Sequence, residues 1–401
     1  SRVGLVSRTP TCFKTKPNVF PCTVPLTNRI HAVTTIHAVT MPKWGLSMTH
    51  GKVVDWLIDE GTPVGVGAEV LEVETEKITS AVEAPAPGVL RRRVAGAGVE
   101  LPVGALLGVI AAAEVPDTEI DEFVTDNEDV IAVEDAGESG PEPESVEVAG
   151  RMLRFLRRGE GGPPALMIHG FGSNLNTWLF NHEPLSVGRE VYALDLPGHG
   201  QSSKEVGDGT IAHLADVVME WLDVVGIPQV HLVGHSLGGA ICLEIACRAP
   251  ARVLSLTLVS SAGLGSEIAA DYVHGFVQAE RRNQLKPHLQ QLFFDPTQVT
   301  RQVVDETLRS KRLDGVSEAL TTIASAFVVD GQQPTRFAGR LAEIQAPKLV
   351  LWGADDRILP AAHAAVLDDQ ATVHVLDDCG HMVHMEGARD VNRLVDQFWQ
   401  S

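Results

Sequence analysis

Two patterns of hydrophobic and polar residues divide the chain near residue 148. Between residues 36 and 112, apolar and polar residues alternate in short runs that are separated by turns rich in Gly and Pro. A period of two is typical of strands with one buried face, and a series of such strands predicts a small all-β sandwich or flattened barrel. The expected strands lie at residues 39–42, 51–58, 69–74, 78–82, 88–94 and 105–110.

After residue 148 the chain alternates between apolar runs and stretches with helical spacing. Strands that are apolar on both faces are typical of a parallel sheet covered by helices, which predicts an α/β fold for residues 148–401. The expected strands lie at 165–170, 190–195, 230–233, 253–259, 348–352 and 372–376, after an opening hairpin at 146–156. The expected helices lie at 211–225, 240–248 and 389–400, with a cap insertion at about 263–342 that holds helices at 272–282, 287–294, 301–312 and 316–327.

Charge separates the two regions. The net charge is −20, and residues 112–148 contain 14 Asp or Glu and no Lys or Arg. Like charges repel one another, so we expect residues 113–147 to form an extended, flexible linker that spans roughly 30–35 Å. The remainder is mildly acidic, which argues against binding of nucleic acid or of an anionic membrane.

Residues 1–35 differ from the rest of the chain. They hold five basic residues and no acidic residue, which predicts a disordered leader, with a targeting segment as the alternative. No apolar run approaches the 18 residues of a transmembrane helix. The five Cys form no C-x-x-C pair and have no metal-ligand spacing with His, so we expect free thiols, no metal site and a cytoplasmic location.

The strongest candidate for catalysis is Ser236, within Gly234-His-Ser-Leu-Gly238. It stands between an apolar run and a stretch of helical spacing, as in the G-x-S-x-G nucleophile elbow. Side chains two positions before and after the serine would clash in so tight a turn, which explains the glycines. The strained turn holds the hydroxyl group out at the N-terminus of a helix. The intervening His235 is expected to pack or support rather than to act as a base.

Three further motifs follow other strands in chain order. They are His169-Gly-Phe-Gly172, Asp195-Leu-Pro-Gly-His-Gly-Gln-Ser202 and Leu351-Trp-Gly-Ala-Asp-Asp-Arg-Ile-Leu-Pro360, and Gly380-His381 comes last. The set resembles the α/β-hydrolase family, whose catalytic residues follow the order Ser, Asp, His.

The resemblance to α/β hydrolases implies roles for five residues. Ser236 is the nucleophile, His381 the base and Asp356 the acid, while the N–H groups of Phe171 and Leu237 stabilise the oxyanion. Two alternatives stay open. Asp355 is adjacent to Asp356, and His384 lies one helical turn beyond His381, although both match the family pattern less well.

A single lysine is the candidate for chemistry in the β-rich part. The pattern of residues 72–83 predicts two strands that meet at a turn, with Lys77 at the tip of that turn. Together with Met41–Met48, Glu60-Gly61 and Ala84–Gly88, this stretch resembles lipoyl domains, which implies lipoate in amide linkage to Lys77. Glu76 stands where that family usually has Asp. Biotin is the alternative, but its carriers usually have Met on both sides of the lysine; an unmodified surface lysine is the third interpretation.

The combination of both parts resembles the dihydrolipoamide acetyltransferase component of the acetoin-cleaving system. That resemblance implies acetyl transfer from lipoyl-Lys77 to coenzyme A, a homo-oligomer, and two partners: a thiamine-diphosphate-dependent acetoin-cleaving enzyme and dihydrolipoamide dehydrogenase. The usual small basic subunit-binding domain is missing. The His-x-x-x-Asp-Gly motif of standard acyltransferase domains is absent too, because Cys379 follows His374 and Asp378. A simple esterase or thioesterase, and a non-catalytic assembly platform, remain as alternatives.

Overall fold

The computed structural model describes residues 36–42, 44, 48, 50–75, 79–128, 141–367 and 370–400. The expected leader, residues 1–35, and Lys77 therefore lie outside the described residues. We call residues 36–128 the β region and residues 141–400 the α/β region, and we describe each by itself. Among the described residues, no helix combines the length and the apolar character needed to cross a bilayer.

The β region consists of two four-stranded sheets, ordered β1-β8-β6-β3 and β5-β4-β2-β7. All pairings are antiparallel, and the core between the sheets includes Val53, Leu71, Leu90 and Ile110. This arrangement confirms the predicted β-sandwich. The strands are β1 (Ile36–Thr40), β2 (His50–Trp56), β3 (Pro63–Val64), β4 (Glu69–Glu74), β5 (Thr79–Glu83), β6 (Gly88–Arg93), β7 (Glu100–Pro102) and β8 (Leu106–Ala111).

Helix α1 (Asp117–Glu128) occupies part of the expected linker. The prediction of an extended chain is wrong for these residues, because Val115 and Ile120 are buried against strand β8 together with the partly buried Phe123. Arg91 of β6 pairs with Asp117 at 2.8 Å between Nη2 and Oδ1. Two of the acidic residues that were expected to repel one another, Asp117 and Asp121, thus pair with arginines on the sandwich, while a few apolar side chains hold the helix in place.

The α/β region is built on an eight-stranded sheet of order β16-β15-β14-β13-β11-β12-β10-β9. The six strands β16, β15, β14, β13, β11 and β12 pair in parallel with one another. Strand β10 pairs antiparallel with β12 on one side and forms the expected antiparallel hairpin with β9 on the other. The strands are β9 (Glu144–Val148), β10 (Arg151–Arg158), β11 (Ala165–Ile168), β12 (Val191–Leu194), β13 (Val230–His235), β14 (Val253–Val259), β15 (Lys348–Gly353) and β16 (Thr372–Leu376).

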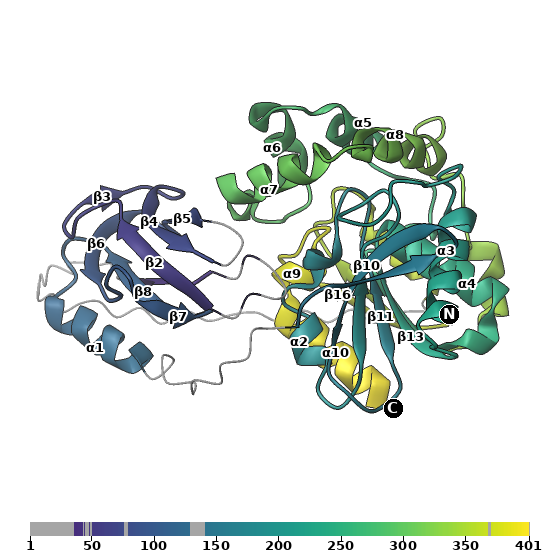
Figure 1. Ribbon diagram of the computed structural model, residues 1–401, viewed down its shortest axis with the longest axis horizontal. Helices are drawn as coiled ribbons and strands as arrows, with labels where there is room; N and C mark the ends of the chain where they lie inside the picture. Colours follow the sequence, from purple (N-terminus) through teal and green to yellow (C-terminus); the bar gives the residue numbers. More distant parts are fainter. Residues whose placement is uncertain are drawn as a thin grey trace, which may run out of the picture. The chain divides into compact units, whose positions relative to one another are not determined.

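Helices cover both faces of this sheet, as the apolar strands predict (Figure 1). Successive residues of a strand point to opposite faces, so Leu232 of β13 joins the core on one face and Val233 joins the core on the other. The first core lies under α3 (Ile211–Val224) and α4 (Leu237–Arg248). The second lies under α2 (His182–Leu185), α9 (Val383–Glu386) and α10 (Ala388–Gln400). Short 3₁₀ helices are η2 (Leu175–Trp178), η3 (Pro250–Arg252), η5 (Ala338–Glu343) and η6 (Ala361–Leu367).

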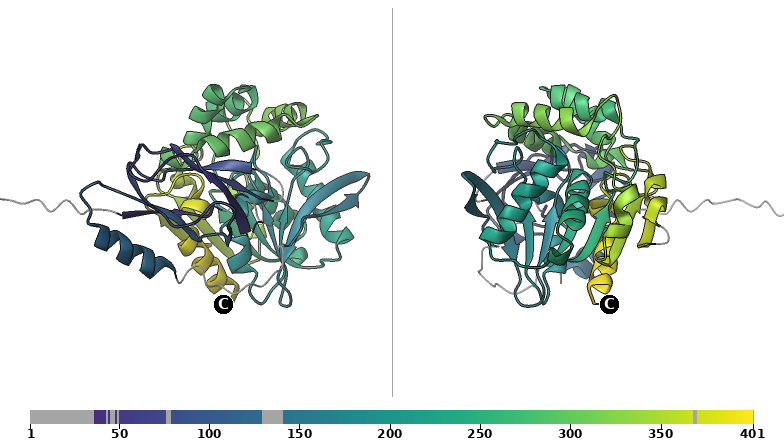
Figure 2. Two further views of the ribbon diagram at one scale, coloured as in Figure 1. Left: turned by 60° about the vertical axis from the view of Figure 1, so that its left-hand side comes forward. Right: turned by 90° about the vertical axis from the view of Figure 1, so that its right-hand side faces the viewer.

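Four helices between β14 and β15 form a cap, which stands out as a separate group in both views of Figure 2. They are α5 (Ala270–Gln278), α6 (Arg282–Gln290), α7 (Arg301–Lys311) and α8 (Val316–Phe327), with the 3₁₀ turn η4 (Pro296–Gln298) between α6 and α7.

Helix α6 begins five residues earlier than the sequence predicts. The expected start was Pro287, and proline is tolerated in the first turn of a helix. Instead, the Gln284 side chain accepts the backbone N–H of Arg281 at 3.1 Å and caps the helix at that earlier point. Pro287 then lies inside the helix.

Candidate active site

Ser236 occupies the turn between β13 and α4 with φ 53° and ψ −118°. A positive φ in a residue other than glycine costs on the order of 1–3 kcal/mol and persists only where the surroundings enforce it. Here the surroundings do so. A Cβ on Gly234 would lie 2.5 Å from the carbonyl oxygen of Gly238, and a Cβ on Gly238 would lie 2.2 Å from that of Ile168. The glycines two positions before and after Ser236 are thus required by the turn.

His381 and Asp356 are joined by a hydrogen bond. His381 Nδ1–H donates to Asp356 Oδ2 at 2.8 Å, and both side chains are buried. The other carboxylate oxygen accepts the N–H groups of Ile358 and Leu359 at 2.8 and 2.9 Å. Because Nδ1 is the donor, Nε2 of the neutral ring carries the lone pair and can accept a proton. Asp355 is exposed, so the structure brings Asp356 rather than Asp355 to the histidine.

Two more histidines, His235 and His384, lie close to His381. The ring of His235 lies 4.7 Å from that of His381 and 4.5 Å from that of His384, between centroids. Burial lowers the pKa of His384 to about 3 and that of His235 well below its usual value. Both rings are therefore neutral. His235 Nε2–H donates to the carbonyl oxygen of His381 at 3.0 Å, and thus ties the loop of His381 to the elbow.

The loop at residues 169–172 lies directly beside the elbow. A Cβ placed on Gly170 would be 3.0 Å from the Cβ of Ser236. Within the described part of the chain, the N–H groups of Phe171 and Leu237 donate to no other residue. Two backbone donors next to the serine hydroxyl, both without a partner, are suited to a negatively charged oxygen.

Two buried histidines hold this loop. His169 donates from Nδ1 to the Gly170 carbonyl at 2.8 Å and accepts the N–H of Leu196 at Nε2. His199 accepts the N–H of Gly172 at Nε2, at 3.0 Å, and donates from Nδ1 to Pro197. Burial lowers their pKa values to about 4 and about 3, which keeps both acceptor nitrogens unprotonated. The sequence motif contains His199, but only the fold shows that it positions the loop.

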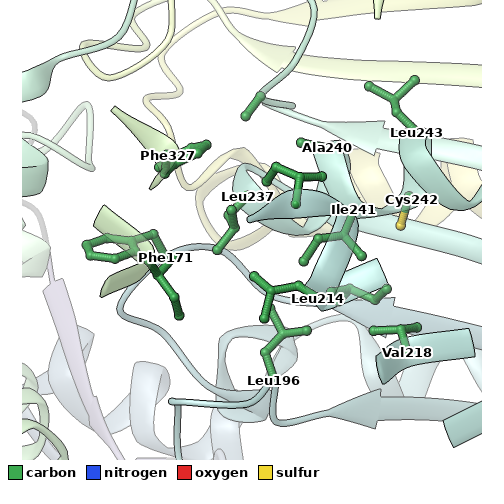
Figure 3. Close-up of a cluster of buried hydrophobic side chains, with 14 of the residues drawn as sticks. Phe171, Leu196, Leu214, Val218, Leu237, Ala240, Ile241, Cys242, Leu243 and Phe327 are labelled. Carbon is green, nitrogen blue, oxygen red and sulfur yellow. The ribbon is translucent and has the colours of Figure 1, made fainter. Parts of the chain in front are cut away.

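A cavity opens over Ser236 and His381, and aromatic side chains form one part of its wall. Its wall includes Phe171, Phe276 of the cap and Phe327 of the cap. The Phe171 ring lies 5.9 Å from that of Phe276 and 6.4 Å from that of Phe327. Figure 3 shows Phe171, Leu237 and Phe327 around the start of α4, with the core side chains behind. Apolar walls exclude water and strengthen every electrostatic interaction inside.

In the β region, strands β4 and β5 pair in antiparallel register, with Glu74 opposite Thr79. These are the two strands that the sequence places on either side of Lys77. Lys77 itself lies outside the described residues, as do Glu76 and Ile78.

Two family models match the chain. One is described as alpha/beta hydrolase fold and matches residues 163–388; the other is described as Biotin-requiring enzyme and matches residues 37–110. Among solved structures, the meta-cleavage product hydrolase of Pseudomonas fluorescens IP01 covers 64% of this chain and 97% of its own, with a TM-score of 0.59 and 22% identity. That similarity shows the fold of the α/β region and no more.

Curated relatives extend the similarity to both regions. The "dihydrolipoyllysine-residue acetyltransferase component of acetoin cleaving system" of Pseudomonas putida is 49% identical over 366 residues, covering 90% of this chain and 98% of the relative. The protein of that name from Cupriavidus necator is 48% identical over 363 residues, covering 90% and 96%. A 2-hydroxy-6-oxononadienedioate/2-hydroxy-6-oxononatrienedioate hydrolase of P. putida is 31% identical over 269 residues, covering 62% and 91%.

The chain is 49% and 48% identical to two relatives over 98% and 96% of their lengths. Proteins that share only a fold can be far less similar in sequence, as the hydrolase structure with 22% identity shows. An aligned length of 366 residues is greater than the α/β region (141–400), so the similarity extends into the β region. The chain therefore belongs to the family of dihydrolipoyllysine-residue acetyltransferase components of acetoin cleaving systems.

Proposed function

We propose that this enzyme passes an acetyl group from a lipoyl arm on Lys77 to coenzyme A, with Ser236, His381 and Asp356 as its catalytic triad. The observation that carries the proposal is the His381–Asp356 hydrogen bond of 2.8 Å, at the wall of the same cavity as a serine held at positive φ. Family membership supports acetyl transfer. Its partners would be a thiamine-diphosphate-dependent acetoin-cleaving enzyme and dihydrolipoamide dehydrogenase.

In the first half of the reaction, Ser236 Oγ attacks the carbonyl carbon of an acetyl thioester while His381 Nε2 takes the hydroxyl proton. The imidazolium is stabilised by the buried Asp356 carboxylate. The tetrahedral centre then collapses, the C–S bond breaks, and His381 returns its proton to the departing sulfur. The acetyl group is left as an ester on Ser236.

In the second half, His381 takes the proton of the coenzyme A thiol, and the sulfur attacks the acetyl carbon. The C–O bond to Ser236 breaks, and His381 returns the proton to Oγ. Serine and histidine end as they began, so the transfer needs no oxidant or reductant.

The oxyanion that forms in each half would be stabilised by the N–H groups of Phe171 and Leu237. Both are free of other partners among the described residues, so no existing hydrogen bond must break. In comparable sites, removing one such donor slows the reaction by about 10²–10³-fold.

The lipoyl group, once joined to Lys77, supplies a thiol that carries the acetyl group as a thioester. The sequence places Lys77 between β4 and β5, which pair with each other, and a lysine between two paired strands is suited to hold such an arm.

Hydrolysis is the second candidate, since the triad is equally suited to water as acceptor and relatives of the α/β region are hydrolases. The test supplies S-acetyl-dihydrolipoamide to the wild type and to Ser236→Ala, with and without coenzyme A. Acetyl-coenzyme A that disappears on mutation supports transfer. Acetate formed without coenzyme A supports hydrolysis, and activity indifferent to the mutation supports an assembly platform. A mass increment on Lys77 tests the carrier separately.

A further inference from the structure

The cap carries a positive charge that the proposed mechanism does not use. Residues 280–312 hold seven Lys or Arg against four Asp or Glu, which gives +3 in a chain whose net charge is −20. Helices α5, α6 and α7 bring this segment together in the cap (Figure 1). A local reversal of sign attracts anions to one place on a protein that otherwise repels them.

Three arginines of this segment form no ion pair with the residues that the structure describes. Arg282 is paired with Asp305. By contrast, Arg281, Arg309 and Arg312 are exposed and make no ion pair with any residue that the structure describes.

These three arginines lie close to one another. Arg312 donates from Nη2 to the carbonyl oxygen of Glu280 at 3.3 Å, which places it at the start of α6, next to Arg281. Arg309 and Arg312 are three residues apart at the end of α7, where side chains of that spacing are neighbours. The arginines therefore form one cluster, which we call the arginine cluster (Arg281, Arg309 and Arg312).

The arginine cluster meets the wall of the cavity that contains Ser236. Arg309 belongs to that wall, together with Gln302, Glu306 and Ser310, so α7 turns a polar face to the cavity. Gln302 Nε2 donates to Glu306 Oε1 at 2.8 Å, and burial raises the pKa of Glu306. Arg309 acts on the Glu306 and Asp305 carboxylates only at longer range and forms no ion pair with either, so its N–H groups are available to an anion that enters the cavity.

We propose that the arginine cluster binds the phosphate groups at the nucleotide end of coenzyme A. This inference rests on the proposed function, in which two thiol compounds use one serine. The acetyl donor has no phosphate, whereas the acceptor carries a diphosphate and a 3′-phosphate far from its thiol. Guanidinium groups bind phosphate through two parallel hydrogen bonds. The cluster therefore selects the acceptor, while the apolar walls near Ser236 accept the uncharged donor.

A binding experiment tests the site directly. Adenosine 3′,5′-bisphosphate is titrated calorimetrically into the wild type, the double variant Arg309→Gln/Arg312→Gln, and Arg336→Gln. Arg336 is a matched control, because it is an exposed cap arginine outside the cavity wall and without an ion pair among the described residues. We expect the Kd to rise about tenfold or more in the double variant and to stay unchanged in the control. Equal affinity in all three proteins would overturn the proposal.

A kinetic experiment separates acceptor recognition from support of the cap. With S-acetyl-dihydrolipoamide as donor, the double variant should raise the KM for coenzyme A about tenfold or more, and leave both the KM for pantetheine and the rate of Ser236 acetylation unchanged. Equal losses with both acceptors would mean that the arginines only support the cap, which contradicts the proposal. A wild type that binds the bisphosphate through these arginines but acetylates no acceptor would refute the proposed transfer and leave the site standing.

Discussion

The β region and the α/β region hold their chemistry in opposite ways. The α/β region assembles its site from segments that lie far apart in the chain, and it buries Ser236, His381 and the Asp356 carboxylate. In the proposed function, the β region relies on a single lysine, Lys77, which the sequence places between the paired strands β4 and β5. The reactivity of a nucleophile that its neighbours activate depends on long-range packing. A carrier lysine needs only to be accessible to the solvent. The two regions should therefore respond differently to mutation and to pH.

The largest expected effect is the loss of acetyl transfer when the proposed nucleophile or the proposed carrier lysine is replaced. Ser236→Ala should lower acetyl transfer by roughly 10⁶-fold for every donor, because it removes the nucleophile. Lys77→Arg should abolish transfer from the protein's own arm and leave transfer from free S-acetyl-dihydrolipoamide unchanged. Single-turnover acetylation with both donors measures this. A loss of activity toward the free donor in Lys77→Arg would show that the β region takes part in the chemistry itself.

The next effect tests the geometry of the acid. Asp356→Asn should lower kcat by about 10⁴-fold, because an amide NH₂ cannot accept the Nδ1 proton and the ring changes tautomer. Asp355→Asn is the matched control, since Asp355 is exposed and should change kcat less than twofold. Comparable losses in the two variants would remove the basis for choosing Asp356.

A third prediction compares how the stability of each region depends on pH. Burial holds the pKa of His169 at about 4 and that of His199 at about 3, against 6.5 for the free side chain. As the pH falls below about 6.5 the unfolded state takes up these protons first, so stability is lost until about pH 3. Each histidine should destabilise the α/β region by roughly 3–5 kcal/mol across that window.

Calorimetry of the full chain between pH 7 and pH 4 measures this effect. The transition of the α/β region should move to lower temperature more steeply than that of the β region, whose two histidines, His37 and His50, are half-buried and exposed. Replacing His199 by Gln should flatten the pH dependence of the α/β transition. Parallel shifts of both transitions would contradict the assignment.

The smallest effect concerns α1. Asp121→Asn removes the partner of Arg92, which lies 2.8 Å away between Nη2 and Oδ1, and exposed pairs of this kind contribute about 1 kcal/mol or less. Hydrogen exchange of the α1 amides should therefore accelerate less than about fivefold. Glu119→Gln is the control, because Glu119 makes no ion pair with the described residues. A much larger acceleration would mean that charge rather than Ile120 holds the helix.

Local patterns predicted much of the fold. The alternation in residues 36–112 corresponds to a sandwich, and α8 has the predicted bounds because its apolar spacing and Gly315 mark both its face and its start. Helix α1 was missed because 14 acidic residues outweighed the few apolar ones at residues 112–148. The start of α6 was misplaced because proline is a stronger local signal than a glutamine side chain that caps from within the helix.

The sequence by itself determined which residues could do the chemistry. Within the motif, a side chain on Gly234 would clash with the backbone of Gly238, whereas the constraint on Gly238 comes from the carbonyl oxygen of Ile168 on the neighbouring strand. Only the tertiary structure decided which groups meet, because hydrogen bonds such as His381 to Asp356, or Gly172 to His199, depend on how distant loops pack. Burial is equally nonlocal. It sets the pKa values of the histidines, and it leaves the arginine cluster exposed beside a cavity that no sequence pattern reveals.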